Sequence, residues 1–189
     1  MAQVIGGEPW KVSASLPPQP CDSGKHWEWD GVRFEVLHPV AEPARGKNRD
    51  NDASCVLRVS GPSGALLLTG DIGVTAEAAL LARVHAGGLR TEVVVSAHHG
   101  SRSSSSPVWL NELMPRWVLI QAGHLNRFGH PAPEVLARYA ARGALAAVHQ
   151  VRAHAQVRKQ LRLLEHVAQR PLVRGQGLDA VLPDLAVDH

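Results

Sequence analysis

Apolar and polar residues alternate over residues 32–36, which read Val-Arg-Phe-Glu-Val. This period of two is typical of a strand with one buried face, so the sequence predicts a strand that ends at His38-Pro39. The stretch 42–52 that follows is polar and carries no such pattern. We therefore expect a loop there.

Four more short apolar runs predict four further strands. Two of them, 55–59 and 65–69, lie on either side of Ser60-Gly61-Pro62-Ser63-Gly64, which is rich in turn formers. These two runs therefore predict an antiparallel hairpin. The runs 93–96 and 117–121 are more uniformly apolar, and 93–96 in particular is expected inside a sheet that is covered on both faces.

Apolar residues at helical spacing predict three helices between or after these strands. The first spans 74–85 and ends at Gly87-Gly88. The second begins at Pro107, with Ser106 as its cap, and ends before Pro115. The third opens at Ala132-Pro133-Glu134, runs through Arg142 and is closed by Gly143. The predicted order of β, β, β, α, β, α, β, α indicates an α/β fold, a mixed sheet with flanking helices.

The two ends of the chain differ from this central part, 31–143. Residues 1–30 contain scattered prolines and tryptophans without a period, so an irregular leader is expected. Residues 144–170 are rich in Ala, Leu, Gln and Arg and predict a basic amphipathic helical segment, and 171–189 a loose tail. The cations of that segment either line a phosphate-binding face or form a solvated helix face; they are Arg152, Arg158, Lys159 and Arg162.

The overall composition fits one soluble globular unit. The chain has 189 residues, of which 44% are hydrophobic, enough for one core. It has no stretch near the roughly 20 apolar residues of a membrane span and no apolar signal-peptide region. A net charge of +3 is compatible with a nucleic-acid partner without requiring one. Cys21 and Cys55 lie in unlike contexts, so we expect two incidental thiols.

Potential metal ligands follow two of the predicted strands. Asp71 follows the run 65–69 through Gly70, and His98 and His99 follow 93–96. Ligands collect beyond the carboxyl ends of strands in open α/β sheets, and imidazole and carboxylate groups bind zinc-like ions. Asp71 could equally be a turn or cap residue of the next helix. Successive side chains alternate along an extended backbone, so we expect one histidine to bind metal and its neighbour to orient substrate.

Two further loops carry groups suited to a phosphodiester. The serine run 101–106 contains Arg102 and precedes a helix, so it is either a plain linker or an anion site built from hydroxyls, amides and a guanidinium. In the loop 123–131, His130 is expected to contact the scissile group and Arg127 a phosphate, with Asn126 near the same rim. A turn with two incidental histidines is the alternative interpretation of this loop.

Taken together, four motifs resemble the C-terminal metallo-β-lactamase-like domain of the ComEC family of competence DNA-internalisation proteins. They are Asn51-Asp52-Ala53-Ser54-Cys55-Val56-Leu57, Leu67-Leu68-Thr69-Gly70-Asp71-Ile72, His98-His99-Gly100-Ser101 and Asn126-Arg127-Phe128-Gly129-His130-Pro131. The resemblance implies an αββα sandwich with a metal site between two sheets. It also implies a role in degrading or handling the DNA strand that is not taken up in natural transformation.

The resemblance also implies a set of site residues. Asp71 would bridge two ions, and His98 or His99 would complete one of them, so these three are the expected metal ligands. The expected catalytic residues are Asp71, His98, His99 and His130. The expected substrate-binding residues are Asn51, Asp52, Ser54, Ser101, Arg102, Asn126 and Arg127.

The sequence departs from the family pattern because it lacks the His-x-His-x-Asp-His motif of the metallo-β-lactamase superfamily. We therefore expect a partial sandwich without the N-terminal metal-motif half. With half of the ligand set, the isolated chain should bind zinc or manganese weakly or not at all, because a two-metal site needs ligands from both halves. The strand pair that the family has after Gly143 is also not expected from this sequence, a difference that a frame change or divergence would explain.

These residues are consistent with three functions. The first is a metal-dependent nuclease or phosphodiesterase of the ComEC type, completed by an upstream portion or another chain, and attached through a larger protein to a membrane channel in the bacterial inner membrane. The second is a non-catalytic module that binds single-stranded DNA. The third is an inactive, truncated remnant whose exposed apolar sheet face associates with other molecules.

Overall fold

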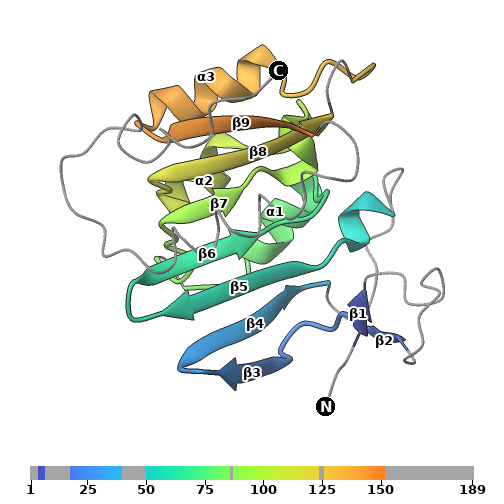
Figure 1. Ribbon diagram of the computed structural model, residues 1–189, viewed down its shortest axis with the longest axis vertical. Helices are drawn as coiled ribbons and strands as arrows, with labels where there is room; N and C mark the ends of the chain where they lie inside the picture. Colours follow the sequence, from blue (N-terminus) through green and yellow to red (C-terminus); the bar gives the residue numbers. More distant parts are fainter. Residues whose placement is uncertain (1–3, 7–17, 40–49, 86, 124–125, 152–189) are drawn as a thin grey trace, which may run out of the picture.

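The computed structural model describes residues 4–6, 18–39, 50–85, 87–123 and 126–151. These residues form a seven-stranded sheet with the strand order β3-β4-β5-β6-β7-β8-β9 (Figure 1). Strands β1 and β2 form a separate, short two-stranded parallel sheet. The strands are β1 (Val4–Gly6), β2 (Pro18–Pro20), β3 (His26–Trp29), β4 (Val32–His38), β5 (Val56–Gly61), β6 (Gly64–Leu68), β7 (Val93–Val95), β8 (Trp117–Gly123) and β9 (Leu145–Val151).

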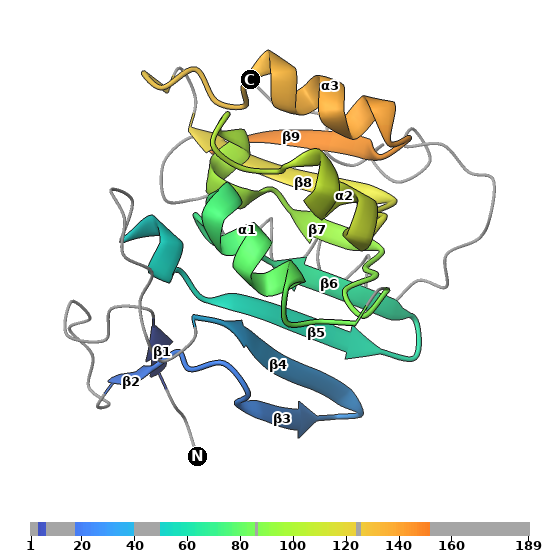
Figure 2. The same ribbon diagram turned by 180° about the vertical axis from the view of Figure 1, so that it is seen from behind.

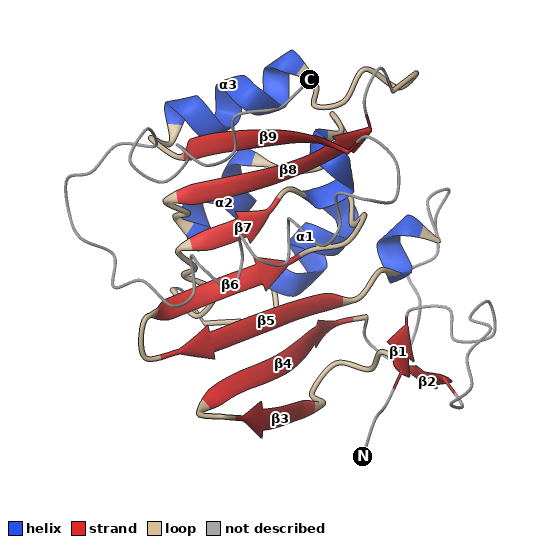
Figure 3. Ribbon diagram, viewed as in Figure 1, coloured by secondary structure: helices blue, strands red, loops and turns tan. Residues whose placement is uncertain are grey.

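The sheet changes from antiparallel to parallel at β6, as the colouring by secondary structure helps to follow (Figure 3). Strands β3 to β6 are antiparallel neighbours, and tight turns join β3 to β4 and β5 to β6. Strands β6 to β9 are parallel, so each connection must cross over, and a helix lies in each crossover. The helices are α1 (Val74–Leu81), α2 (Pro107–Leu113) and α3 (Pro133–Ala141).

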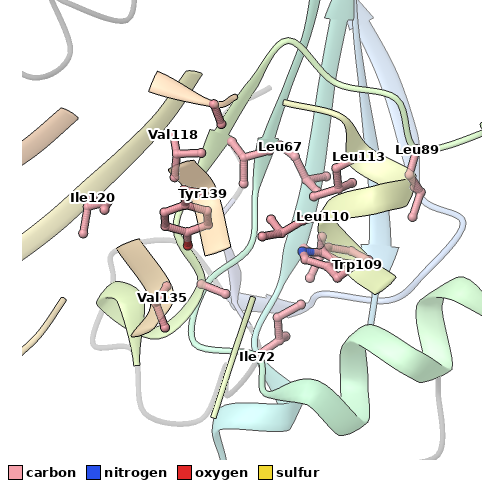
Figure 4. Close-up of a cluster of buried hydrophobic side chains, with 14 of the residues drawn as sticks. Leu67, Ile72, Leu89, Trp109, Leu110, Leu113, Val118, Ile120, Val135 and Tyr139 are labelled. Atoms are coloured by element: carbon pink, nitrogen blue, oxygen red, sulfur yellow. The ribbon is translucent and has the colours of Figure 1, made fainter. Parts of the chain in front are cut away.

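The hydrophobic core lies between the helices and one face of the sheet (Figures 2 and 4). Trp109 and Leu110 of α2 and Tyr139 of α3 are each 1% exposed, and they pack over Leu67 of β6 and Ile120 of β8. The period of two along the strands explains this arrangement, since alternate residues of β6 and β8 are the buried ones. None of the helices in the described part of the chain is long and apolar enough for a membrane span.

Apolar side chains on the opposite face of the sheet are only half-buried. They include Leu57 and Leu68, which lie opposite each other on β5 and β6, and the pair Val95 and Leu119 on β7 and β8. The sheet is therefore apolar on both faces in its centre, although the described helices pack on one of them.

The α/β architecture and three predicted helices are confirmed, with small shifts at their ends. The helix predicted over 74–85 ends at Leu81. The helix after Ser106 begins at Pro107, and the Ser106 side chain accepts a hydrogen bond from the Trp109 N–H, as expected of a cap.

The expectation of a wholly irregular leader is wrong, because residues 26–29 form strand β3. This strand pairs with β4 across a turn at Asp30 and Gly31, whose φ angles are 50° and 76°. An Asp-Gly pair is a strong hairpin signal, because both positions tolerate a positive φ. Trp27 also stacks on Phe34 with ring centroids 5.2 Å apart.

The helix predicted from residue 144 is also wrong over 145–151, where the chain forms strand β9 beside β8. The alanines of this run suggest a helix, but parallel pairing with β8 over seven residues outweighs that preference. A strand therefore does follow Gly143, contrary to the expectation from the sequence. The remainder of the predicted helical segment, with its four cations, and the tail 171–189 lie outside the described residues.

The two cysteines are not incidental thiols, because Cys21 and Cys55 form a disulfide with a Cα–Cα distance of 5.8 Å. Cys55 directly precedes β5 and follows Ser54, whereas Cys21 is buried next to the short strand β2. The bond therefore links the segment before β3 to the residue that directly precedes β5. Local sequence context could not show this pairing, because it brings together residues 34 positions apart.

A buried carboxylate joins α1 to the serine-rich loop before α2. Glu77 is 0% exposed and accepts hydrogen bonds from the backbone N–H groups of Ser105 and Ser106. Arg138 of α3 donates to the carbonyl oxygens of Ser104 and Ser105 in the same loop. Burial raises the pKa of Glu77 above its ordinary value of 4.5, and the two amide donors partly offset this rise.

The disulfide should stabilise the fold by restricting the unfolded chain. Replacing both cysteines with serine should lower the free energy of unfolding by about 3–4 kcal/mol, the value expected for a closed loop of roughly this length. Urea denaturation of the two proteins measures the difference. The wild type in a reducing agent should match the double variant, and an unchanged midpoint on reduction would contradict a bond between Cys21 and Cys55.

Glu77 should make the stability depend on pH. Because its pKa is raised in the folded state, the folded protein binds this proton more tightly than the unfolded chain does. Relative to Glu77→Gln, the wild type should therefore lose free energy of unfolding as the pH rises above 4.5. Urea denaturation of both proteins across this pH range tests the slope. Parallel pH profiles would show that the carboxylate does not titrate as expected.

Candidate functional site

Three loops meet at the carboxyl ends of the parallel strands β6, β7 and β8 (Figure 1). The loop after β6 carries Asp71. A short 3-10 turn after β7, Ala97–Gly100, carries His98 and His99. The loop between β8 and α3 carries His130. Parallel strands direct their following loops to one edge of the sheet, which is why residues distant in sequence become neighbours here.

Asp71 and His99 face each other across this edge. The distance from Asp71 Oδ1 to His99 Nε2 is 3.6 Å. The other ring nitrogen of His99, Nδ1, lies 2.7 Å from the backbone oxygen of Gln121 and donates to it, since a carbonyl oxygen can only accept. When the ring is neutral, Nε2 therefore carries the lone pair, and this nitrogen is the one nearer to the Asp71 carboxylate.

Two electron-pair donors at this separation suit a cation between them. Ligands that each lie about 2.1 Å from a tetrahedral zinc ion are about 3.4 Å apart. The pair Asp71 and His99 therefore fits one edge of a metal site. A catalytic zinc ion takes three protein ligands, however, and no group of three or more His, Cys, Asp or Glu side chains in the described residues could hold a metal. Among the described residues, Asp71 and His99 thus do not by themselves make up the three protein ligands of a catalytic zinc ion.

The two histidines do not lie on an extended backbone, which corrects the expectation of strand-like alternation. His98 and His99 both have left-handed conformations, with φ of 48° and 55°. Their rings nevertheless diverge, because the turn directs them to different partners. His98 Nε2 lies 3.4 Å from the side-chain amide of Asn51, which donates to it, and the His98 N–H donates to the Gly70 oxygen.

The segment 50–54 supports the loop after β6. The Ser54 hydroxyl accepts a hydrogen bond from the Asp71 N–H at 3.2 Å, and Asp52 Oδ1 accepts one from the Gly73 N–H at 3.0 Å. Gly73 is the cap of α1, and no side chain makes a capping bond there, so Asp71 is not the helix cap, although it does lie in the turn before the helix. Asn51, Asp52 and Ser54 thus lie against the loop that carries Asp71.

His130 completes a group of three imidazoles at this edge. Its ring meets that of His98 edge-on, with centroids 5.8 Å apart. Burial, followed by the nearby charges of His98 and His99, holds the pKa of His130 below its ordinary 6.5, and Asp71 opposes this shift. The ring is therefore neutral at neutral pH. It can accept a proton or donate one hydrogen bond.

The serine run is a packed part of the structure, so its interpretation as a plain linker is wrong. Ser104 and Ser105 are 0% and 2% exposed. The Ser104 hydroxyl donates to the Ala97 oxygen, and the Ser105 hydroxyl lies 2.7 Å from the hydroxyl of Tyr139, which also contacts Ser96. These hydroxyls are occupied inside the protein. They hold the turn with His98 and His99 against α3.

Ser101 and Arg102, at the beginning of the serine run, lie in a different environment. Ser101 and Arg102 line a surface hollow of about 220 Å³, and its other lining residues are Phe128, Gly129, His130 and Ala132. The Arg102 side chain is exposed and forms an ion pair with Glu134, with 3.3 Å between Nε and Oε1. The hollow therefore adjoins the imidazole group and has a cation at its rim.

The structure brings the predicted site residues to one edge of the sheet, but sequence reasoning missed several residues that support them. The sequence pattern marks His38 only as the end of a strand, yet its Nε2 donates to the Asp52 oxygen at 2.6 Å. No motif singles out Tyr139, although it is the single tyrosine of the chain and joins two serine hydroxyls. Phe128 lies within one of the four motifs, but its exposure could not be read from the sequence.

Gly70 should be needed for the close approach of the Asp71 loop to Ser54. Its φ is +57°, and a Cβ atom there would lie 2.7 Å from Ser54 Cβ. Gly143 has a similar φ of +70° but open space around it, so Gly143→Ala is a matched control for backbone strain alone. Gly70→Ala should lower the free energy of unfolding by about 1–3 kcal/mol more than the control, because of the added clash. Equal losses in urea denaturation would show that the loop yields freely.

Comparison with known proteins finds relatives among competence proteins. The chain is 41% identical over 119 residues to the competence protein ComA of Neisseria gonorrhoeae, which covers 63% of this chain and 17% of ComA. It is 32% identical over 118 residues to the recombination protein 2 of Haemophilus influenzae, covering 62% of this chain and 14% of that protein. It is 30% identical over 105 residues to the ComE operon protein 3 of Bacillus subtilis, covering 56% and 13%. The chain thus spans a small part of the length of each relative.

No protein-family model matches the chain. Among solved structures, it is similar to a metal-dependent hydrolase of the beta-lactamase superfamily, with 13% identity, a TM-score of 0.41, and coverage of 71% of this chain and 57% of that one. The sequence relationships are the stronger result, and they agree with the motifs at the strand ends. The chain is homologous to the ComA and ComEC-type competence proteins over a part of their length.

Proposed function

We propose that the chain is part of a metallo-β-lactamase-like nuclease or phosphodiesterase domain of the ComEC type, in which Asp71 and His99 form one edge of a divalent metal site. The observation that carries this proposal is the 3.6 Å separation of Asp71 Oδ1 and His99 Nε2, with Nδ1 of the same ring donating to Gln121. Homology to ComA-type proteins supports the assignment of the domain. Of the two candidate histidine ligands, this geometry favours His99.

The half-buried second face of the sheet supports a partial αββα sandwich. In such a sandwich, two sheets pack face to face, and each has apolar residues on its inner side. Leu57, Leu68 and Leu119 are placed on that face and are half-buried. We propose that the other layer, with the remaining metal ligands, comes from an upstream portion of a larger protein or from another chain. By homology, that larger protein would be a membrane channel of the bacterial inner membrane.

The proposed substrate is a phosphodiester, with DNA favoured by the competence relatives. A bound divalent ion would activate water and polarise the phosphoryl oxygen. The residues of this chain would then bind and orient. Arg127 and Arg102 would contact phosphates, and the neutral His130 would contact the scissile group.

The incomplete ligand set also favours a second function, binding of DNA without catalysis. In the described residues the proposed metal edge would consist of two groups only, whereas the exposed Arg102 and Arg127 beside it can contact phosphates without a metal. An inactive remnant would keep the fold and neither of these properties. Metal binding and DNA binding, measured separately, therefore distinguish the three functions.

Metal binding at Asp71 and His99 should stabilise the folded chain. Manganese or zinc at about ten times its dissociation constant should add about 1.4 kcal/mol to the free energy of unfolding, which corresponds to a rise of about 3–6 °C in melting temperature. Asp71→Ala and His99→Ala should each abolish most of the rise. Differential scanning calorimetry with and without the metal measures it.

A matched control is His26→Ala, which removes a histidine from β3, the outermost strand, which β4 and β5 separate from β6. This variant should keep the full metal-dependent rise. If metal raises the melting temperature of Asp71→Ala as much as that of the wild type, the binding site lies elsewhere. If the wild type shows no rise up to millimolar metal, the chain alone does not form the proposed edge.

A further inference from the structure

The loop between β8 and α3 presents an aromatic ring to solvent beside the imidazole group. Phe128 is 67% exposed. Its ring stacks on that of His130, with 5.9 Å between centroids and 17° between planes, and the guanidinium carbon of Arg127 lies 4.9 Å from the Phe128 centroid. The exposed ring thus has an imidazole and a guanidinium as direct neighbours.

The position of Phe128 is determined by hydrogen bonds within its loop. The side-chain amide of Asn126 donates to the oxygens of Gly123 and His130 at 3.1 Å and 2.8 Å, and its oxygen accepts from the His130 N–H at 2.9 Å. The Gly129 N–H donates to the Asn126 backbone oxygen. These bonds hold the backbone on both sides of Phe128, so less of this segment has to be ordered when a ligand binds.

A single exposed apolar residue is normally of no significance. Val108 of α2, for example, is 65% exposed. Phe128 differs because it lines the 220 Å³ hollow together with Arg102 and His130. An apolar protein partner would match the ring but not the two flanking cations, Arg102 and Arg127. An unpaired nucleotide matches both, since its base has a flat face and its phosphate is an anion.

We infer that Phe128 is a stacking platform for a base of single-stranded nucleic acid, with Arg127 and Arg102 placed to contact the adjoining phosphates. The inference rests on the proposed function, because it names the feature of the substrate that the same rim holds. From Phe128, the contacts lead through His130 to His98, which adjoins His99 and its partner Asp71. A base on the platform would therefore position its backbone next to the proposed metal edge. Glu134, which pairs with Arg102, would have to release or share this cation.

Fluorescence anisotropy with a labelled oligothymidine tests the platform in the presence of EDTA, so that metal binding does not enter. Phe128→Ala should weaken binding by about 5- to 150-fold, the range for loss of one stacked base. Phe128→Trp should bind at least as tightly as the wild type. Trp29→Ala is the matched control, since Trp29 is 69% exposed but lies on β3 at the far edge of the sheet, and its removal should leave the affinity unchanged (Figure 1).

An abasic oligonucleotide of the same length separates stacking from phosphate contact. The wild type should bind it about as weakly as Phe128→Ala binds oligothymidine, and Phe128→Ala should show little further loss. If Phe128→Ala weakens both oligonucleotides equally, or weakens neither, the platform is wrong. An oligouridine arm shows whether the site prefers DNA or RNA. Because these measurements contain no metal, they can succeed or fail independently of the metal-binding test.

The melting temperature of Phe128→Ala should equal that of the wild type, because the ring is mostly in solvent. If this variant is destabilised, Phe128→Leu replaces it, since leucine keeps an apolar side chain but cannot stack on a base. Loss of oligothymidine binding with leucine and retention with tryptophan would support stacking. Full binding by the leucine variant would overturn it.

Discussion

The parallel pairing of β6, β7 and β8 is the constraint on which the rest of the structure depends. It places the ends of three strands side by side, so that the loops after Leu68, Val95 and Gly123 begin at one edge of the sheet. Antiparallel pairing would send neighbouring loops to opposite edges. The meeting of one carboxylate with three imidazoles is thus a consequence of strand direction, which the helical crossovers between these strands make possible.

The loops at this edge are held by hydrogen bonds from buried polar side chains. Glu77 receives two amide donors, Tyr139 joins two serine hydroxyls, and His38 donates to a carbonyl of the 50–54 segment. Buried polar groups are costly unless they are paired, so a network of this kind permits few alternative arrangements. This network surrounds the turn in which His98 and His99 have left-handed backbone conformations. A rigid support is what a site with directed ligands needs.

Two independent features of the chain bear on the proposed second layer. The first is chemical: Asp71 Oδ1 and His99 Nε2 lie 3.6 Å apart, and both are groups that bind divalent cations. The second is hydrophobic: the sheet face without described helices carries apolar side chains that are half-buried. Both features are accounted for if a second layer packs on this face and brings ligands of its own.

The predictions that succeeded depend on local patterns, and those that failed depend on pairing with distant residues. The end of an apolar run is visible in the sequence, so Asp71, His98 and Asn126 can be assigned to strand ends. Strand β9 escapes prediction because its alanines favour a helix when considered alone, whereas β8 offers a full edge for pairing. The disulfide escapes it for the same reason, since nothing near Cys21 indicates that Cys55 is its neighbour.

The sequence by itself therefore determined which residues stand at the rim of the sheet and what chemistry they can offer. Only the tertiary structure decided which histidine ring faces Asp71 and which aromatic ring faces solvent. The physical reason is that the orientation of the His99 ring depends on an acceptor in another element, the Gln121 oxygen of β8, and the exposure of Phe128 depends on which surfaces the rest of the fold leaves uncovered. A side chain's direction is determined by its partners, and those partners become neighbours only when the strands pair.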